Sequence, residues 1–280
     1  MSIESTTSTS HSQNNPIRVL HVFPPSLRSR FGGQNIYWKY AFEHWDDPAI
    51  LHSVLETRTN QMITPREAFN FDYDHEQRMT PKWERITWVF SLFRNLVKHQ
   101  REYDILHVHV LWWGSLLLGP WAKRKCIPTI YESVLLIEDS PGGIIQERLG
   151  KLKLWCLKKY SAILTISEPL TEDYLNFGFH ASQVHMLMNA VDTDVFYPTT
   201  SEVEKRTLRR KHSLPEEAKI LLFVGSVIWR KGVDILIDAF IKAEKENKDL
   251  YLILVGARNK QENPSLDENL IHHLQEVLDK

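Results

Sequence analysis

The 280-residue sequence predicts an α/β protein built on doubly wound, parallel sheets. Short apolar, β-branched runs such as "DILHVHV" and "SAILTIS" are each followed by a longer segment with apolar residues at helical spacing. This alternation is typical of βαβ units, in which helices cover both faces of a parallel sheet. A charged stretch, "TTSEVEKRTLRRKHSLPEE", separates a long first series of elements from a short second one.

The elements of the first series each have a local signal. The strands are apolar and rich in β-branched residues, and glycine, proline and polar residues mark the ends of the helices. We expect the helix over residues 114–125 to be interrupted or ended by Gly119-Pro120. Predicted strands cover 17–23, 50–57, 104–110, 127–133, 161–167 and a segment after 183, and predicted helices cover 34–45, 81–103, 114–125, 145–160 and 168–179.

The second series predicts a strand over 219–225, a helix over 233–247, a strand over 250–256 and a helix over 269–280. Two strands and two helices are too few to cover both faces of a parallel sheet, so we expect an incomplete domain with exposed apolar surface. The predicted organisation is a disordered Ser/Thr/Asn-rich tail over 1–15, a first domain over 16–198, a linker over 199–215 and a partial second domain over 216–280.

Composition excludes several functional classes. The net charge of -1 provides no basic field for nucleic acid. Cys126 and Cys156 are too few for a disulfide framework or a zinc site, and they favour a reducing, cytoplasmic setting. No apolar run is long enough to span a bilayer.

The helix over 81–103 combines an apolar stripe with basic residues, which is compatible with peripheral binding to an anionic membrane. We expect instead that the stripe packs against the rest of the domain and leaves a solvated basic face. The stripe consists of Trp83, Ile86, Phe90, Phe93 and Val97, with Arg85, Arg94, Lys98 and Arg101 nearby.

Ligands of open parallel sheets bind beyond the carboxyl ends of the strands. Gly32 and Gly33 follow the first predicted strand, where glycines let backbone N–H groups approach an anion, although a tight turn explains them equally well. His107 and His109 share one face of a strand, and His109 lies nearer its carboxyl end. A core histidine is the alternative for His109. Glu132 ends the strand over 127–133 and is a candidate for function.

Two adjacent cations, Arg230 and Lys231, lie beyond Gly225 in the turn that leads into a predicted helix. Cations at a helix N-terminus are unfavourable for the helix itself, because its dipole and free N–H groups favour anions. The forked guanidinium and the point charge of the lysine together suit a diphosphate. We therefore prefer a phosphate site to a solvated basic turn.

The order of these motifs resembles the family 4 retaining glycosyltransferases of the GT-B fold. The resemblance spans nearly the whole ordered chain. It is carried by six segments, "HVFPPSLRSRFGGQNIYWKYAF", "YDILHVH", "IPTIYESVLLIED", "ILTISEPLTEDYLNFGF", "VHMLMNAVDTDVFYP" and "FVGSVIWRKGVDILIDAF".

The resemblance implies transfer of a sugar from a UDP- or GDP-linked donor to a glycan or lipid-linked acceptor, with retention at the anomeric carbon. It implies no metal and no other cofactor, and Asp192 and Asp194 without a third ligand do not contradict this. Polysaccharide or glycoconjugate biosynthesis at the cytoplasmic face of a membrane is the implied setting.

Site residues follow from the same resemblance. The two adjacent cations would hold the donor diphosphate and stabilise the leaving charge. The glycines of the first domain would bring backbone N–H donors to the same phosphates. The histidine and the glutamate at the strand ends would line the acceptor side of the cleft. The implied catalytic residues are His109, Glu132, Arg230 and Lys231, and the implied donor-phosphate residues are Gly32, Gly33, Gly225, Arg230 and Lys231.

The family's later Glu-x7-Glu segment, which binds the sugar and ribose of the donor, has no counterpart in this sequence. We therefore expect a truncated or split enzyme, completed by a second polypeptide, that binds nucleotide sugars weakly by itself. A non-catalytic remnant that binds a partner through the first domain is the alternative. A nicotinamide-dependent oxidoreductase is excluded because the glycine loop lacks the third glycine of that fingerprint.

Overall fold

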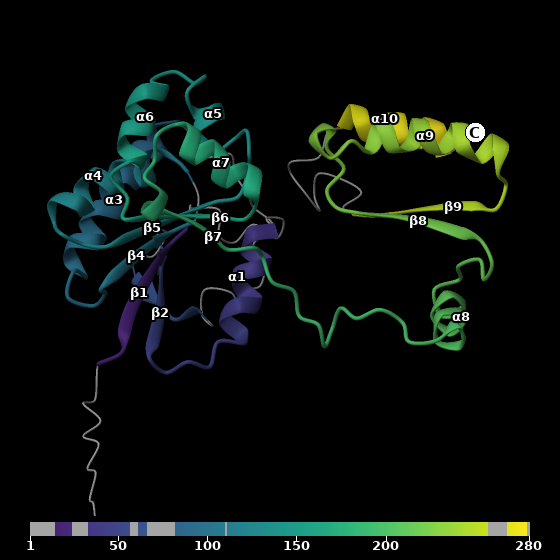
Figure 1. Ribbon diagram of the computed structural model, residues 1–280, viewed down its shortest axis with the longest axis horizontal. Coiled ribbons are helices and arrows are strands. Elements are labelled where there is room, and N and C mark those ends of the chain that lie inside the picture. Colours follow the sequence, from purple (N-terminus) through teal and green to yellow (C-terminus); the bar gives the residue numbers. More distant parts are fainter. Residues whose placement is uncertain are drawn as a thin grey trace, which may run out of the picture. The chain divides into compact units, whose positions relative to one another are not determined.

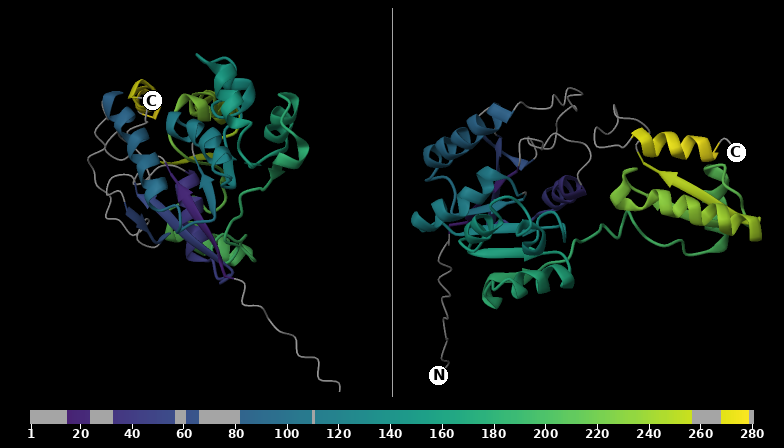
Figure 2. Two further views of the ribbon diagram at one scale, coloured as in Figure 1. Left: turned by 90° about the vertical axis from the view of Figure 1, so that its left-hand side faces the viewer. Right: turned by 90° about the horizontal axis from the view of Figure 1, so that it is seen from above.

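The computed structural model describes residues 15–23, 33–56, 61–65, 82–109, 111–256 and 268–278. They form two compact units, of which the first ends at Asn189 and the second begins at Ala190 (Figures 1 and 2). Each unit is a parallel sheet with helices packed on it, so the predicted α/β fold is confirmed. None of the helices in the described ranges is long and apolar enough to cross a membrane.

The first unit holds a seven-stranded sheet of order β3-β2-β1-β4-β5-β6-β7. All neighbouring strands pair in parallel except β2 and β3, which are antiparallel. The short edge strand β3 was not predicted, because three residues carry too little pattern. The strands are β1 (Ile17–Val22), β2 (Ile50–Glu56), β3 (Gln61–Ile63), β4 (Ile105–Val108), β5 (Thr129–Ser133), β6 (Ala162–Thr165) and β7 (Val184–Met186).

Helices cover both faces of this sheet. The main core joins one face of the sheet to helices α3, α4, α5, α6 and α7, and a smaller core joins the other face to α1. The helices are α1 (Gly33–Glu43), α3 (Lys82–Lys98), α4 (Trp113–Arg124), α5 (Pro141–Ile144), α6 (Gly150–Leu157) and α7 (Glu168–Asn176), and a short 3-10 turn, η1 (Ala181–Gln183), precedes β7.

Two helices differ from the prediction. Helix α4 runs through Pro120 without a break, because burial of Leu116, Leu118 and Ala122 on its inner side stabilises the helix despite one missing backbone hydrogen bond. The helix expected over 145–160 is shorter in the structure, where α6 begins only at Gly150, and a separate short helix that was not predicted, α5, lies before it. Leu149, directly before α6, has a left-handed backbone with φ of 65°.

The apolar stripe of α3 does not pack as expected. Leu92 and Leu96 are buried against the sheet, whereas Ile86, Phe90 and Val97 are exposed. The side that faces solvent is therefore the side that the sequence pattern had assigned to the core.

The second unit contains β8 (Lys219–Val224) and β9 (Leu250–Val255), paired in parallel, with α9 (Val233–Glu246) and α10 (Glu268–Leu278) packed on one face. The other face of this sheet exposes Leu222 and Val224, in agreement with the expected exposed apolar surface.

The predicted linker over 199–215 contains a helix, α8 (Glu202–Lys211). The side chain of Ser201 caps its N-terminus by accepting a hydrogen bond from the backbone N–H of Glu204 at 3.2 Å. Acidic residues in the first turn and basic residues in the last turn complement the helix dipole. These signals are present in the sequence, and the charged character of the segment concealed them.

Gly119 allows α4 and α6 to approach closely because it has no side chain. A Cβ atom at this position would lie 2.8 Å from the carbonyl oxygen of Cys156 and 2.8 Å from the ring of Tyr160. The ring cannot move away easily, because Tyr160 is buried and its hydroxyl donates to the carbonyl of Ser115 at 2.5 Å. We expect Gly119→Val to lower the free energy of unfolding by about 1–3 kcal/mol, measured by urea denaturation.

The matched control is Leu117→Val on the exposed side of the same helix, for which we expect a change within about 0.5 kcal/mol. Equal stability of the Gly119 variant and the control would show that the two helices do not depend on this contact.

Candidate active site

Four histidines and one glutamate gather on the α1 face of the first unit's sheet. Successive side chains of a strand point to opposite faces, so the residues that alternate with the buried apolar positions share the face that α1 covers. His21 lies on β1, His52 on β2, His107 on β4, His109 directly after β4 and Glu132 on β5. All but His52 are buried.

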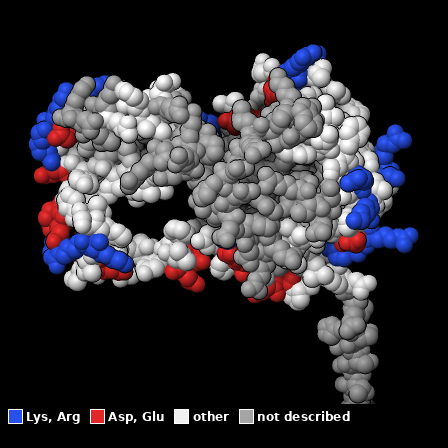
Figure 3. All heavy atoms as spheres, turned by 180° about the vertical axis from the view of Figure 1, so that it is seen from behind, with Lys and Arg blue, Asp and Glu red and all other residues white. Residues whose placement is uncertain are grey.

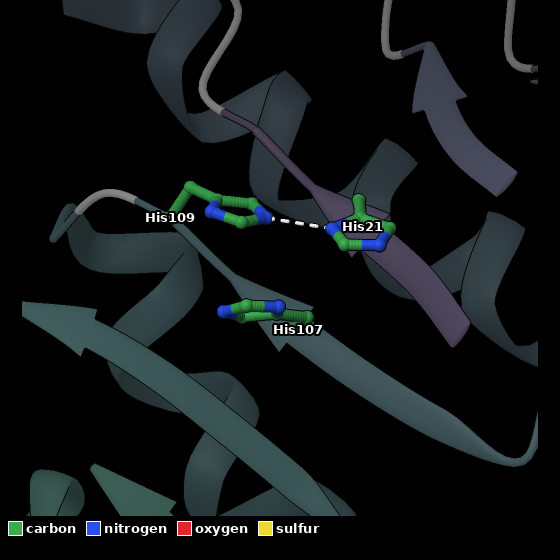
Figure 4. A group of neighbouring side chains, drawn as sticks. All are labelled: His21, His107 and His109. Carbon is green, nitrogen blue, oxygen red and sulfur yellow. Dashed lines mark hydrogen bonds between the residues drawn. The ribbon is translucent and has the colours of Figure 1, made fainter. Parts of the chain in front are cut away.

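Hydrogen bonds connect four of these residues in one chain. His109 Nδ1 lies 2.7 Å from Glu132 Oε2, His21 Nδ1 lies 2.8 Å from His109 Nε2, and His52 Nδ1 lies 2.8 Å from His21 Nε2. Figure 4 shows the bond between His21 and His109. Because a carboxylate only accepts, neutral rings satisfy every bond when each donates from Nδ1 and accepts at Nε2.

Glu132 also holds helix α1. Its Oε2 atom accepts hydrogen bonds from Trp38 Nε1 at 2.7 Å and from Gln34 Nε2 at 3.0 Å. Only 4% of Glu132 is exposed. Burial by itself would raise the pKa of this carboxyl, but the hydrogen bonds from His109, Trp38 and Gln34 outweigh burial and lower its pKa. The carboxylate therefore stays ionised and ties the first turns of α1 to β5.

The histidines stay neutral because, for them, the effect of burial on the pKa is the dominant one. Burial lowers the pKa of His21 and His107 well below the ordinary histidine value, and the neighbouring histidines add to this. Burial also lowers the pKa of His52. For His109, burial lowers the pKa and Glu132 only partly opposes it. A neutral chain of imidazoles thus ends on an ionised carboxylate.

A metal ion would compete with this chain of hydrogen bonds. Nitrogen atoms of His21, His107 and His109 lie within 4.8 Å of one another (Figure 4). However, the His21 and His109 nitrogens that face each other are already hydrogen-bonded, and an ion between them would have to break that bond. The absence of a cofactor stays a prediction from the sequence.

The second candidate region is the turn between β8 and α9. Gly225 directly follows β8, and its N–H donates to the carbonyl of Val255 at 2.9 Å. Arg230 and Lys231 are exposed and lie in a single 3-10 turn, η2 (Trp229–Lys231). Gly232 follows with φ of 65°, a backbone that favours glycine, and α9 begins at the next residue.

The structure thus brings the predicted residues together in two groups. His109 and Glu132 are in contact in the first unit, and Gly225, Arg230 and Lys231 share one turn of the second unit. Gly33 is the first residue of α1, and Gly32 lies outside the described residues.

Sequence reasoning missed His21 as the partner of His109 and His52 as the partner of His21. His21 alternates with buried apolar positions in "IRVLHV", as His107 does in "ILHV", and this shared pattern was the available signal. Trp38 and Gln34 could not have been found, since their contact with Glu132 spans 94 and 98 residues of sequence.

A second buried carboxylate, that of Asp139, lies in the loop after β5. Asp139 accepts hydrogen bonds from the backbone N–H groups of Val134 at 3.1 Å and Leu135 at 2.7 Å. Burial raises the pKa of Asp139 to about 6, against the effect of these bonds. Asp139 shapes the loop beside a cavity of about 690 Å³ whose lining includes Glu138, Glu172 and Asp173. Because the carboxylates of the lining would repel an anion, the cavity is unsuited to a phosphate.

The neutral histidines make stability depend on pH. A histidine whose folded pKa is lowered stabilises the protein above its unfolded pKa of about 6.5 and loses this contribution as the pH falls. Each such histidine contributes up to about 1.4 kcal/mol per pH unit in this window. The raised pKa of Asp139 has the opposite effect on stability: its contribution is lost as the pH rises through about 6. We expect urea denaturation to give a free energy of unfolding that decreases from about pH 7.5 to about pH 5.5.

His107→Phe isolates one contribution, since the buried Nε2 of His107 has no hydrogen-bond partner among the described residues. We expect the free energy of unfolding of this variant to depend less steeply on pH than that of the unmodified protein. Parallel curves for His107→Phe and the unmodified protein would contradict the neutral state of His107.

Two family models match consecutive parts of the chain. Residues 65–190 match the family model described as "Glycosyl transferase 4-like domain". Residues 204–277 match the model described as "Glycosyl transferases group 1". The two matches follow one another along the chain and fall mainly in the first and the second unit, respectively.

Curated relatives are similar over part of their length. An uncharacterised glycosyltransferase of Methanocaldococcus jannaschii is 25% identical over 182 residues, which are 61% of this chain and 46% of the relative. A D-inositol 3-phosphate glycosyltransferase of Xylanimonas cellulosilytica is 26% identical over 173 residues, which are 56% of this chain and 40% of the relative. The chain spans less than half the length of these two relatives.

Solved structures share the fold. The Anabaena protein HepE in complex with UDP-glucose aligns with a TM-score of 0.61 at 14% identity, over 94% of this chain and 65% of that chain. A UDP-GlcNAc 2-epimerase of Neisseria meningitidis bound to UDP-GlcNAc aligns with a TM-score of 0.53 at 12% identity, over 94% and 70%. The chain thus shares the fold of these structures, and its two parts are similar to a glycosyl transferase 4-like domain and to the glycosyl transferases of group 1.

Proposed function

We propose that this chain takes part in the transfer of a sugar from a UDP- or GDP-linked donor to a glycan or lipid-linked acceptor, with retention at the anomeric carbon. The observation that carries the proposal is the consecutive match of a glycosyl transferase 4-like domain and a group 1 domain. Retention rests on the resemblance to family 4. A nucleotide-linked donor is supported by two proteins of the same fold, of which one binds UDP-glucose and the other UDP-GlcNAc.

The β8–α9 turn is the proposed donor-phosphate site. Arg230 and Lys231 are exposed just before α9, whose first N–H groups have no partner within the helix and favour an anion. Gly225 follows the carboxyl end of β8, the edge at which open parallel sheets bind ligands. This geometry supports a diphosphate, whose two charges the guanidinium and the ammonium would neutralise as the leaving group departs.

The first unit supplies the acceptor side in this proposal. Both ring nitrogens of His109 are hydrogen-bonded, so a direct contact with the acceptor would require one of these bonds to break. We propose that His109 and Glu132 act mainly by positioning α1, whose N-terminal residue Gly33 begins the helix. The ionised carboxylate then keeps this helix N-terminus at the carboxyl edge of the sheet.

Titration of the whole chain with nucleotides tests the donor site. We expect Arg230→Ala and Lys231→Ala each to weaken the binding of UDP or GDP about tenfold or more, because charged hydrogen bonds contribute about 1.5–3 kcal/mol each. Isothermal titration calorimetry with UDP, UDP-glucose, GDP and GDP-mannose measures the dissociation constants. Lys242→Ala, at an exposed position on α9, is the matched control and should bind as the unmodified chain does.

Equal affinities for all variants would contradict the assignment of the phosphate site. Undetectable binding of every nucleotide, also after addition of a polypeptide that supplies the Glu-x7-Glu segment, would favour the alternative of a non-catalytic binding module. Where transfer is observed, NMR of the anomeric proton of the product distinguishes retention from inversion.

A further inference from the structure

The outer side of helix α3 combines exposed apolar and basic residues. Ile86 is 61% exposed and Phe90 is 73% exposed, and both lie on the side of the helix that faces away from the core. Arg94 and Lys98 continue the same side, at successive spacings of four residues. A surface helix of a globular protein normally places its charged residues here and its large apolar residues inside.

Helices α4 and α6 extend this surface. Trp113 and Leu117 are exposed one turn apart on α4, and Leu152 and Trp155 are exposed on α6. Side-chain contacts connect the three helices laterally. The rings of Phe93 on α3 and Trp121 on α4 lie 5.5 Å apart, and the ammonium of Lys153 on α6 lies 5.0 Å from the ring centre of Trp113.

The same three helices concentrate positive charge. Between their first and last residues the sequence has eight Lys or Arg and one acid, Glu84, whereas the whole chain is balanced at 34 basic and 35 acidic residues. The structure shows five of these cations exposed, and Lys153 pairs with Glu147: the exposed ones are Arg94, Lys98, Lys123, Arg124 and Lys151. Lys and Arg side chains project from the edge of the first unit drawn on the right-hand side of Figure 3, with little acidic surface between them. The exposed apolar groups therefore lie within a basic field.

We propose that the outer surface of α3, α4 and α6, defined by Ile86, Phe90, Trp113, Leu117, Leu152 and Trp155 with the surrounding Lys and Arg, binds the surface of an anionic lipid bilayer. Tryptophan and the other apolar side chains would enter the headgroup region, and the cations would contact lipid phosphates. Charge complementarity favours an anionic bilayer over a second copy of this chain, since a second copy would place one basic surface against another.

Scattered exposed apolar residues need no explanation, but a contiguous group of them over three adjacent helices does. The surface lies on the face of the sheet opposite to α1 and the histidine chain. Its proposed role does not involve the donor or the β8–α9 turn, so failure of the membrane proposal would leave the proposed transferase function unaffected.

Vesicle flotation with the whole chain tests the proposal. We expect the protein to float with vesicles of phosphatidylcholine and phosphatidylglycerol and to remain unbound with phosphatidylcholine alone. Binding should weaken between about 0.1 M and about 1 M salt, because the screening length falls from about 10 Å to about 3 Å. No nucleotide is added.

Two double variants separate the apolar and the electrostatic contributions. Ile86→Ser with Phe90→Ser removes the apolar contact, and Arg94→Glu with Lys98→Glu reverses two charges. We expect each pair to lower the vesicle partition coefficient about tenfold or more, since a basic residue near an anionic surface contributes about 1 kcal/mol. The control is Val203→Ser with Lys211→Glu on α8, both exposed, which should bind vesicles as the unmodified chain does.

Circular dichroism confirms that each variant is folded. Three results would overturn the proposal: no flotation with anionic vesicles, equal flotation with neutral vesicles, or unchanged flotation of both double variants. Sedimentation without lipid tests self-association. If the unmodified chain is a dimer and both double variants are monomers, the surface is a self-association interface instead.

Discussion

A buried carboxylate, that of Glu132, holds together the elements on which the first unit's site depends. It lies on β5 and accepts hydrogen bonds from His109 beyond β4 and from Gln34 and Trp38 on α1. A buried charge is tolerated only when its partners are in place, and each hydrogen bond to a charged group typically contributes about 1.5–3 kcal/mol. The position of α1 is therefore coupled to the ends of two strands.

The histidines extend this coupling to the edge of the sheet. His21 and His52 continue the chain of hydrogen bonds from β4 to β1 and β2, and burial keeps their rings neutral. A neutral imidazole donates at one nitrogen and accepts at the other, so each ring fixes the orientation of the next. The result is a hydrogen-bonded polar layer beneath α1, which supports the proposal that these residues position α1.

The two faces of the first sheet thus have different tasks in our proposals. The α1 face carries the polar chain and the carboxyl ends of the strands, where ligands of such sheets bind. The main core packs the opposite face against helices that include α3, α4 and α6 (Figure 1). These three helices present apolar and basic groups outward. Binding of that outer surface to lipid would leave the α1 face accessible to an acceptor.

Local patterns in the sequence were sufficient to predict the α/β class, nearly every strand, the helix α9 beyond Gly232 and the turn with Arg230 and Lys231, because periodicity, glycine and proline are local signals. The buried side of α3 and the groups that surround Glu132 could be found only from the packed structure. Both depend on contacts between segments far apart in the chain. Trp38 meets Glu132 across 94 residues, and no local pattern encodes such a distance.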